Sequence, residues 1–114
     1  MSFGIEFSEA SEHDLELLFD HLFESYVGFG ESPNEAFERA AQRVLGIREA
    51  ASRLATAPIR GTPQDDVLPG VRFLTIDRAI YWFDVDEHRT IVRVLAIFFG
   101  GQDHIRHMLL RMLS

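Results

Sequence analysis

Three histidines are the first residues in this sequence whose chemistry could serve a reaction. His104 and His107 are three residues apart, so on a helix they lie on neighbouring parts of one face. Such a pair can ligate zinc, yet two ligands do not complete a site and the sequence has no cysteine, so we expect no metal. Histidine titrates near neutral pH, and His88, His104 or His107 could therefore act as an acid or a base. The simpler interpretation is that all three are solvated.

The basic residues are the second candidates, and all eleven of them are arginines. Eighteen acidic residues outweigh them and give a net charge of −7. Proteins that follow a nucleic acid through a broad basic face carry clustered Lys and Arg, so we expect no direct nucleic-acid binding. Any phosphate recognition must come from a few local arginines. A long loop folded over a sheet could gather Arg60, Arg72, Arg78 and Arg93.

Two of these arginines have competing interpretations. Arg72 can pair with Asp65, Asp66 or Asp84 and hold the loop, or it can contact a partner. Arg93 stands between two valines in an apolar run. A charged side chain in that position needs either a partner or an exposed face.

An aromatic run suits base stacking or, more simply, core packing. Tyr81 and Phe83 share one face of the expected strand, while Trp82 takes the other. At most one of these sets can therefore form the main core face. If Trp82 lies on an open face, it is a natural anchor for a partner.

Helical periodicity dominates the first half of the chain. After an alternating strand at 3–7, apolar residues recur at helical spacing to Tyr26, with Ser8 or Ser11 as the cap and glycines at 28 and 30 as the stop. Asp14 lies three residues after Ser11 in a loose capping box, so its carboxylate should face the first-turn amides.

We expect Phe19 and Leu22 to be core residues of this first helix, and truncating either to alanine to cost roughly 2 to 5 kcal/mol. Ser32-Pro-Asn-Glu35 starts a second helix, which should run to about Ala57 and form a hairpin with the first.

The second half switches to strand periodicity. Residues 58–70 are rich in Pro and Gly and predict an irregular connection. Runs at 71–76, 79–85 and 90–99 predict an antiparallel meander, and Gln102 or Asp103 caps a final helix. The element order is β-α-α-β-β-β-α. We expect an α+β fold with a single domain over 1–114.

Several classes of protein are excluded by composition. No apolar run approaches the roughly 20 residues that span a bilayer, so we expect no membrane association of that kind. The first residues lack the basic start and apolar stretch of a signal peptide, and a cysteine-free chain suits a reducing compartment. We therefore expect a cytoplasmic protein.

Three stretches, in their order and spacing, resemble the RelE/ParE superfamily of bacterial toxins. They are Leu68-Pro-Gly-Val-Arg72, Ile80-Tyr-Trp-Phe-Asp-Val85 and Arg93-Val-Leu-Ala-Ile-Phe-Phe-Gly-Gly-Gln-Asp103. The likeness covers nearly the whole chain. It implies a helical hairpin packed on a small, mainly antiparallel sheet, no cofactor, and a type II toxin that inhibits growth until a cognate antitoxin neutralises it.

The superfamily contains two chemistries. RelE-like members cleave messenger RNA on the ribosome, and ParE-like members bind DNA gyrase. Arg72 matches a superfamily arginine, but Ile80 stands where ribonuclease members commonly have another, with Arg78 displaced toward the turn. The lysines of that branch are missing too, so the resemblance favours a ParE-like gyrase inhibitor that is not an enzyme.

Two alternatives remain at this point. One is a ribosome-dependent endonuclease that uses Arg72 with His104 or His107. The other is a toxin-fold protein that has lost toxicity and serves as an interaction module. If the protein acts by binding, as a gyrase inhibitor or as an interaction module, we expect five residues to contact the target or the antitoxin. They are Arg60, Arg72, Arg78, Trp82 and Arg93.

The acidic excess lies wholly in residues 1–57, which hold eleven acidic residues and four arginines, whereas 58–114 hold seven of each. The simple interpretation is that these charges form the solvated outer faces of two helices. The sharper hypothesis is that they attract an antitoxin segment with basic residues.

Overall fold

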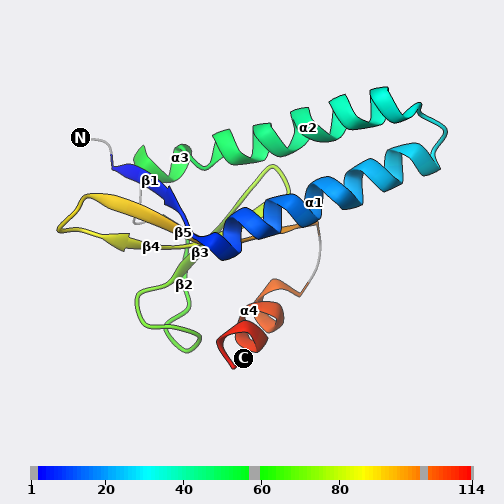
Figure 1. The fold of residues 1–114 in the computed structure, drawn as a ribbon. Helices are drawn as coiled ribbons and strands as arrows, with labels where there is room; N and C mark the ends of the chain where they lie inside the picture. Colours follow the sequence, from blue (N-terminus) through cyan, green and yellow to red (C-terminus); the bar gives the residue numbers. More distant parts are fainter. Residues whose placement is uncertain (1–2, 57–59, 101–102, 114) are drawn as a thin grey trace.

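A computed structural model describes residues 3–56, 60–100 and 103–113. One sheet, a long helical hairpin and a C-terminal helix make up the fold (Figure 1). The elements, in chain order, are β1 (Gly4–Phe7), α1 (Glu9–Gly28), α2 (Pro33–Ala50), α3 (Arg53–Thr56), β2 (Thr62–Pro63), β3 (Arg72–Ile76), β4 (Ala79–Asp86), β5 (Ile91–Phe99) and α4 (His104–Met112).

The sheet has five strands in the order β1-β5-β4-β3-β2. The predicted meander of β3, β4 and β5 is confirmed, and every neighbouring pair is antiparallel except β1 with β5. The short strand β2 lies inside the region predicted to be irregular. It adds an edge because Thr62 and Pro63 pair with Phe73 and Arg72.

The predicted helix starts are confirmed. Ser8 caps α1, its Oγ accepting from the Ser11 N–H at 3.0 Å, and Ser32 caps α2 in the same way from the Glu35 N–H at 3.2 Å. The two helices form a hairpin, which projects beyond the sheet (Figure 1). Asp103 caps α4, and the alternative cap Gln102 lies outside the described residues.

The prediction that the second helix runs to about Ala57 is wrong, because α2 already ends at Ala50. The chain then forms the short helix α3, in which Leu54 and Ala55 are buried against the sheet. The Ala55 carbonyl accepts a hydrogen bond from the Phe3 N–H at 3.2 Å.

Two apolar clusters cover the two faces of the sheet. The base of the hairpin packs over Tyr81 and Phe83, while Trp82 faces the other way and packs with Val71, Phe98 and Met108. The predicted alternation is therefore confirmed. The expectation that at most one of these sets forms the main core face is confirmed, because Tyr81 and Phe83 belong to the larger cluster. Trp82 belongs to the smaller cluster, on the face that α4 covers.

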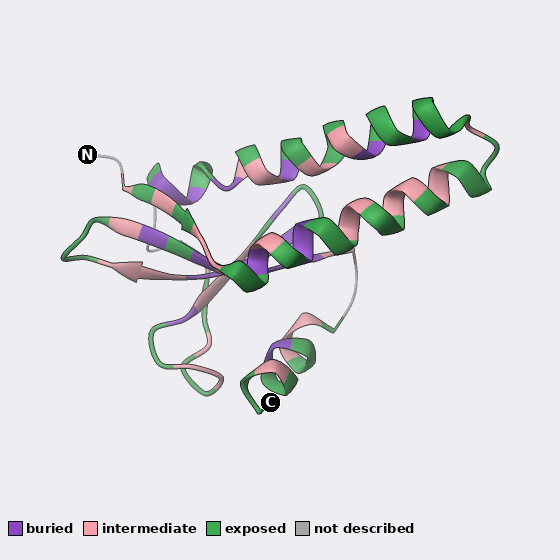
Figure 2. Cartoon of the chain, viewed as in Figure 1, coloured by how far each residue is buried: buried purple, intermediate pink, exposed green. Residues whose placement is uncertain are grey.

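The prediction that Phe19 and Leu22 are core residues is also wrong. Both are only partly buried and neither belongs to either cluster. On α1 the buried residues are Ser11, Asp14 and Leu15, near the start of the helix (Figure 2). The distal half of the hairpin extends past the sheet, so its apolar stripe packs mainly on the other helix. None of the described helices is long and apolar enough to span a bilayer.

Candidate functional site

The face of the sheet under α4 brings together three of the residues that the sequence singles out, namely Trp82, His104 and His107. Asp103 starts the helix by accepting from the Arg106 N–H at 3.3 Å, and Met108 then points inward with 2% of its surface exposed. Trp82 lies beneath it and is 0% exposed. The hypothesis that Trp82 sits on an open face and anchors a partner is therefore wrong for this arrangement, because α4 covers the indole.

His104 fastens the first turn of α4 to the sheet. Its Nδ1 accepts a hydrogen bond from Trp82 Nε1 at 3.2 Å, and its ring meets that of Phe73 edge-on at a centroid distance of 4.6 Å. Burial lowers the pKa of His104, an effect that neighbouring Asp103 partly opposes. Since only the neutral ring can accept at Nδ1, this histidine has a structural bond to lose if it takes up a proton.

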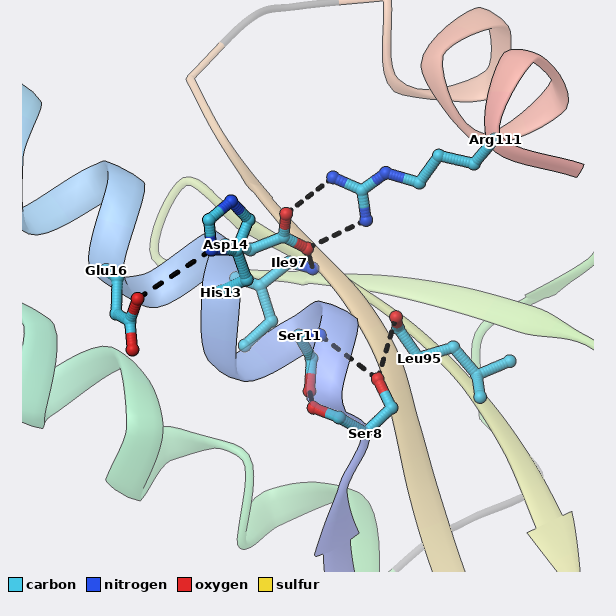
Figure 3. Close-up of polar contacts among 8 residues, drawn as sticks. All are labelled: Ser8, Ser11, His13, Asp14, Glu16, Leu95, Ile97 and Arg111. Atoms are coloured by element: carbon cyan, nitrogen blue, oxygen red, sulfur yellow. Dashed lines mark hydrogen bonds and ion pairs between the residues drawn. The ribbon is translucent and has the colours of Figure 1, made fainter. Parts of the chain in front are cut away.

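A partly buried ion pair fastens the last turn of α4. Arg111 donates from Nη1 and Nη2 to the two carboxylate oxygens of Asp14 on α1 (Figure 3). The same carboxylate accepts from the backbone N–H of Ile97 at 2.9 Å. The Arg111 guanidinium carbon also lies 4.9 Å from the Phe98 ring centroid. The side chain of Asp14 thus joins α1 to both β5 and α4.

Asp14 therefore does not complete a capping box as predicted. Ser8 caps the helix one turn earlier, and Asp14 points from α1 to β5 and α4 (Figure 3). The prediction missed this contact, as it missed Arg111. The available signal was a carboxylate beside the apolar stripe of the first helix, because a buried charge there requires a cationic partner.

A hollow of about 370 Å³ lies beside this ion pair, between α1 and the end of β5. His21 and His107 contribute to its wall with Phe98. The ring of His107 stacks on Phe98 at a centroid distance of 5.9 Å. The charged groups in this wall, Asp14 and Arg111, neutralise each other.

Arg72 lies on the other side of the sheet from these histidines. Its cross-strand neighbour is Phe83 of the hairpin-facing cluster, whereas the next residue, Phe73, is opposite Trp82. Directly opposed residues share a face of a sheet, so Arg72 and His104 point to opposite faces. Arg72 Nη1 donates to the Gly61 carbonyl at 3.4 Å. The grouping of Arg72 with His104 and His107 that RNA cleavage would need is not formed.

Two of the three aspartates that were predicted to pair with Arg72 bind other groups in the structure. Asp84 binds Arg93, and Asp65 Oδ1 accepts from the Gly70 N–H at 2.8 Å, closing its own loop.

Arg93 has both a partner and exposure. Its Nε and Nη2 donate to Asp84 at 2.9 and 2.7 Å across β5 and β4, while 46% of its side chain stays exposed. The hydrogen bonds that Arg93 donates to Asp84 raise the pKa of Arg93 further above its usual value. Nearby, Arg89 donates to Glu6 at 3.0 Å. This end of the face is a mixed ionic network.

The remaining predicted contact residues lie elsewhere. Arg60 is exposed in the segment that precedes β2, and Arg78 is exposed in the turn between β3 and β4. The structure therefore does not bring Arg60, Arg72, Arg78, Trp82 and Arg93 into one surface. Within the described part of the chain, no group of three or more His, Asp or Glu side chains is arranged to hold a metal ion.

No protein-family model matches the sequence, and no curated protein matches it significantly. Among solved structures, the chromosomal ParDE toxin–antitoxin system of P. aeruginosa is similar, with a TM-score of 0.64 and 22% identity over 88% of this chain and 98% of the other. The toxin–antitoxin complex RelBE2 of Mycobacterium tuberculosis follows, with a TM-score of 0.62 and 16% identity over 90% and 95%.

A mutant of the E. coli toxin RelE in the free state matches over the whole of both chains, with a TM-score of 0.53 and 8% identity. At these identities the likeness is one of fold. It agrees with the order of elements and with the hairpin packed on the sheet. The chain therefore has a RelE/ParE-like fold.

Proposed function

We propose that this protein is the toxin of a type II toxin–antitoxin pair and acts by binding DNA gyrase, as a ParE-like inhibitor. The observation that carries the proposal is the separation of Arg72 from His104 and His107 by the thickness of the sheet. The likeness in fold to the ParDE system supports it. A protein that acts by binding needs no convergent acid, base and cations.

RNA cleavage makes strict geometric demands. Attack by a 2′-oxygen needs a base for that hydroxyl, an acid for the leaving oxygen and fixed cations for the phosphorane charge. Here the histidine acceptor is bound to Trp82, and the Arg93 guanidinium is bound to Asp84. At least six of the eleven arginines have a carboxylate within 4 Å. More than half of the arginines therefore have a carboxylate partner within the fold.

The proposed antitoxin docks on the outer groove of the hairpin. A hollow of about 550 Å³ lies between α1 and α2, with Phe19, Val44 and Leu45 in its wall and Glu16 and Asp20 beside them. More than half of the Leu45 side chain is exposed. A segment with apolar side chains and basic residues fits this surface, because residues 1–57 hold the whole acidic excess.

Two charge reversals test this contact. Glu16→Arg and Asp20→Arg should each weaken binding to the product of the adjacent reading frame by about tenfold, a loss of about 1.4 kcal/mol. Glu87→Arg is the matched control, because it makes the same change at an exposed position in the β4–β5 turn. If all three variants lost the same affinity, the effect would come from overall charge, and the proposal that the antitoxin docks on this groove would be wrong.

Expression of the chain alone in a bacterial host tests the mode of toxicity. We expect growth arrest and an SOS response, with no codon-register cuts in primer-extension maps of messenger RNA. Such cuts, if Arg72→Ala abolished them, would overturn the proposal in favour of an endonuclease. Normal growth at high expression would instead identify a non-toxic interaction module.

A further inference from the structure

We propose that a hollow between the hairpin and the end of the sheet binds a compact ligand with two or more adjacent phosphates, such as a nucleoside triphosphate. The hollow measures about 530 Å³ and is separate from the groove and from the face under α4. This proposal does not depend on the toxin activity. The lining residues are Leu22, Tyr26, Arg39, Gln42, Arg43, Arg78 and Phe99.

The charge of this lining is unusual for the molecule. Three of its seven residues are arginines and none is acidic, in a chain with eighteen acidic residues and a net charge of −7. Arg39 and Arg43 are four residues apart on α2, so they share one face of the helix. Arg78 comes from the turn between β3 and β4. The positive groups thus converge from two distant parts of the chain.

Aromatic rings hold these guanidinium groups in place. The Arg43 and Arg78 guanidinium carbons lie 5.2 and 5.9 Å from the centroid of the Phe99 ring. Arg39 lies 4.3 Å from the centroid of the Tyr26 ring. A guanidinium that stacks on an aromatic ring keeps the N–H groups at its edge available to an anion.

Two of the three arginines have no carboxylate partner among the described residues. Arg39 pairs with Glu31, but neither Arg43 nor Arg78 forms an ion pair with any described residue. Six of the described arginines, Arg39 among them, do have such a partner. An arginine pair without counter-charge, held over one ring, is suited to the doubly charged oxygens of a phosphate.

The backbone at Arg78 supports a specific role for this residue. Asp77 and Arg78 both have positive φ, 49° and 74°, and form the two-residue connection between β3 and β4. Such turns prefer Asn-Gly or Asp-Gly, because glycine adopts this conformation without a steric penalty. The Gly100 N–H donates to the Arg78 carbonyl at 3.0 Å and fixes the turn beside the end of β5. An arginine therefore occupies a position at which glycine is favoured.

The ligand should be compact. Two guanidinium groups without a described carboxylate partner, and a third that also pairs with Glu31, suit the charge of a di- or triphosphate. A longer nucleic-acid strand would have to cross the acidic surroundings of a chain with net charge −7. A carboxylate-rich peptide is a different class of ligand, and a comparison of its affinity with that of pyrophosphate distinguishes the two. Pyrophosphate is the part common to nucleotides and polyphosphate.

Isothermal titration calorimetry on the full chain at low salt tests the site with pyrophosphate, ATP, inorganic phosphate, a short single-stranded RNA and a poly-glutamate peptide. We expect pyrophosphate and ATP to bind, at least tenfold more tightly than the other three. Equal affinity for both identifies the phosphates alone as the ligand, and tighter binding of ATP identifies a nucleotide. Absence of binding by both, or equal or tighter binding of RNA or the peptide, would overturn the proposal.

Single variants locate the binding. Arg43→Gln and Arg78→Gln should each weaken pyrophosphate binding at least tenfold, whereas Arg106→Gln, an equal change of charge at an exposed position on α4, should alter it less than twofold. Thermal unfolding confirms that each variant is folded, and Arg78→Lys provides a milder change should Arg78→Gln fail that check. Equal effects of all variants would show non-specific attraction and contradict the assignment.

Discussion

The carboxylate of Asp14 and the guanidinium of Arg111, 97 residues apart, form a two-pronged ion pair that fastens α4 to α1. Only 5% of the Asp14 side chain is exposed, and its second role is to accept the Ile97 N–H. The helix that covers Trp82 is therefore held at both ends, by this pair and by His104. Whether the face under α4 is accessible to a partner depends on these contacts.

Removal of the ion pair should uncover the indole. Arg111→Ala leaves Asp14 as a buried charge without its cation, and we expect the free energy of unfolding to fall by about 3 kcal/mol. Trp82 is the single tryptophan, so its fluorescence reports on α4 directly. Its emission should shift to the red and acrylamide quenching should increase. Arg106→Ala is the control, and unchanged quenching in Arg111→Ala would mean that the pair does not hold the helix.

The His104 contact should depend on pH. Because burial lowers its pKa in the folded protein, the unfolded chain takes up a proton first as the pH falls. The stability from the neutral ring is therefore complete above the unfolded value of about 6.5 and declines below it. The midpoint of thermal unfolding should fall more steeply from pH 7.5 to 5.5 in the wild type than in His104→Gln. Parallel slopes would contradict this account.

Tyr81 should couple the hairpin to the sheet. Its hydroxyl donates to the Ile47 carbonyl of α2 at 2.6 Å, and burial raises its pKa to about 12. Tyr81→Phe should lower the free energy of unfolding by about 1 to 2 kcal/mol, because the buried carbonyl loses its donor. In the wild type this contribution is complete below pH 10 and is lost as the pH rises toward 12. Urea unfolding at pH 8 and pH 11 measures both effects, and equal stability of the two proteins at pH 8 would refute the first.

Truncations on α1 should follow burial over the sheet. Leu15 is 5% exposed within the core cluster, so Leu15→Ala should cost about 3 kcal/mol. Phe19→Ala and Leu22→Ala, in the projecting half, should cost less than Leu15→Ala because both side chains already contact solvent. Chemical denaturation ranks the three. A larger loss from Phe19→Ala than from Leu15→Ala would restore the prediction made from periodicity.

These residues also show how far the sequence could predict the fold. Caps at Ser8 and Ser32 and the alternation of Tyr81 with Trp82 are local signals, and the structure confirms each of them. Periodicity identified the apolar stripe of α1 but could not show that only its first turns reach the sheet. That depends on where the hairpin crosses the strands, which is a tertiary property.

The candidate site was less predictable. Asp14 and Arg111 meet only after the chain has folded, so no spacing rule relates them. The endonuclease alternative paired Arg72 with His104 because the resemblance to RelE-like toxins suggested an arginine on the sheet and a histidine near the C-terminus. The register of β3 against β4 determines which face of the sheet Arg72 lies on. A shift of one residue would place Arg72 on the same face as His104.

The central claim is that the protein acts by binding gyrase, and a supercoiling and DNA-cleavage assay with purified gyrase tests it most directly. Added toxin should inhibit supercoiling and accumulate cleaved DNA, and it should do so equally with Arg72→Ala that is folded and soluble. Pre-incubation with the antitoxin should restore supercoiling. A preparation that arrests growth in cells but leaves gyrase activity unchanged at every toxin concentration would contradict the account.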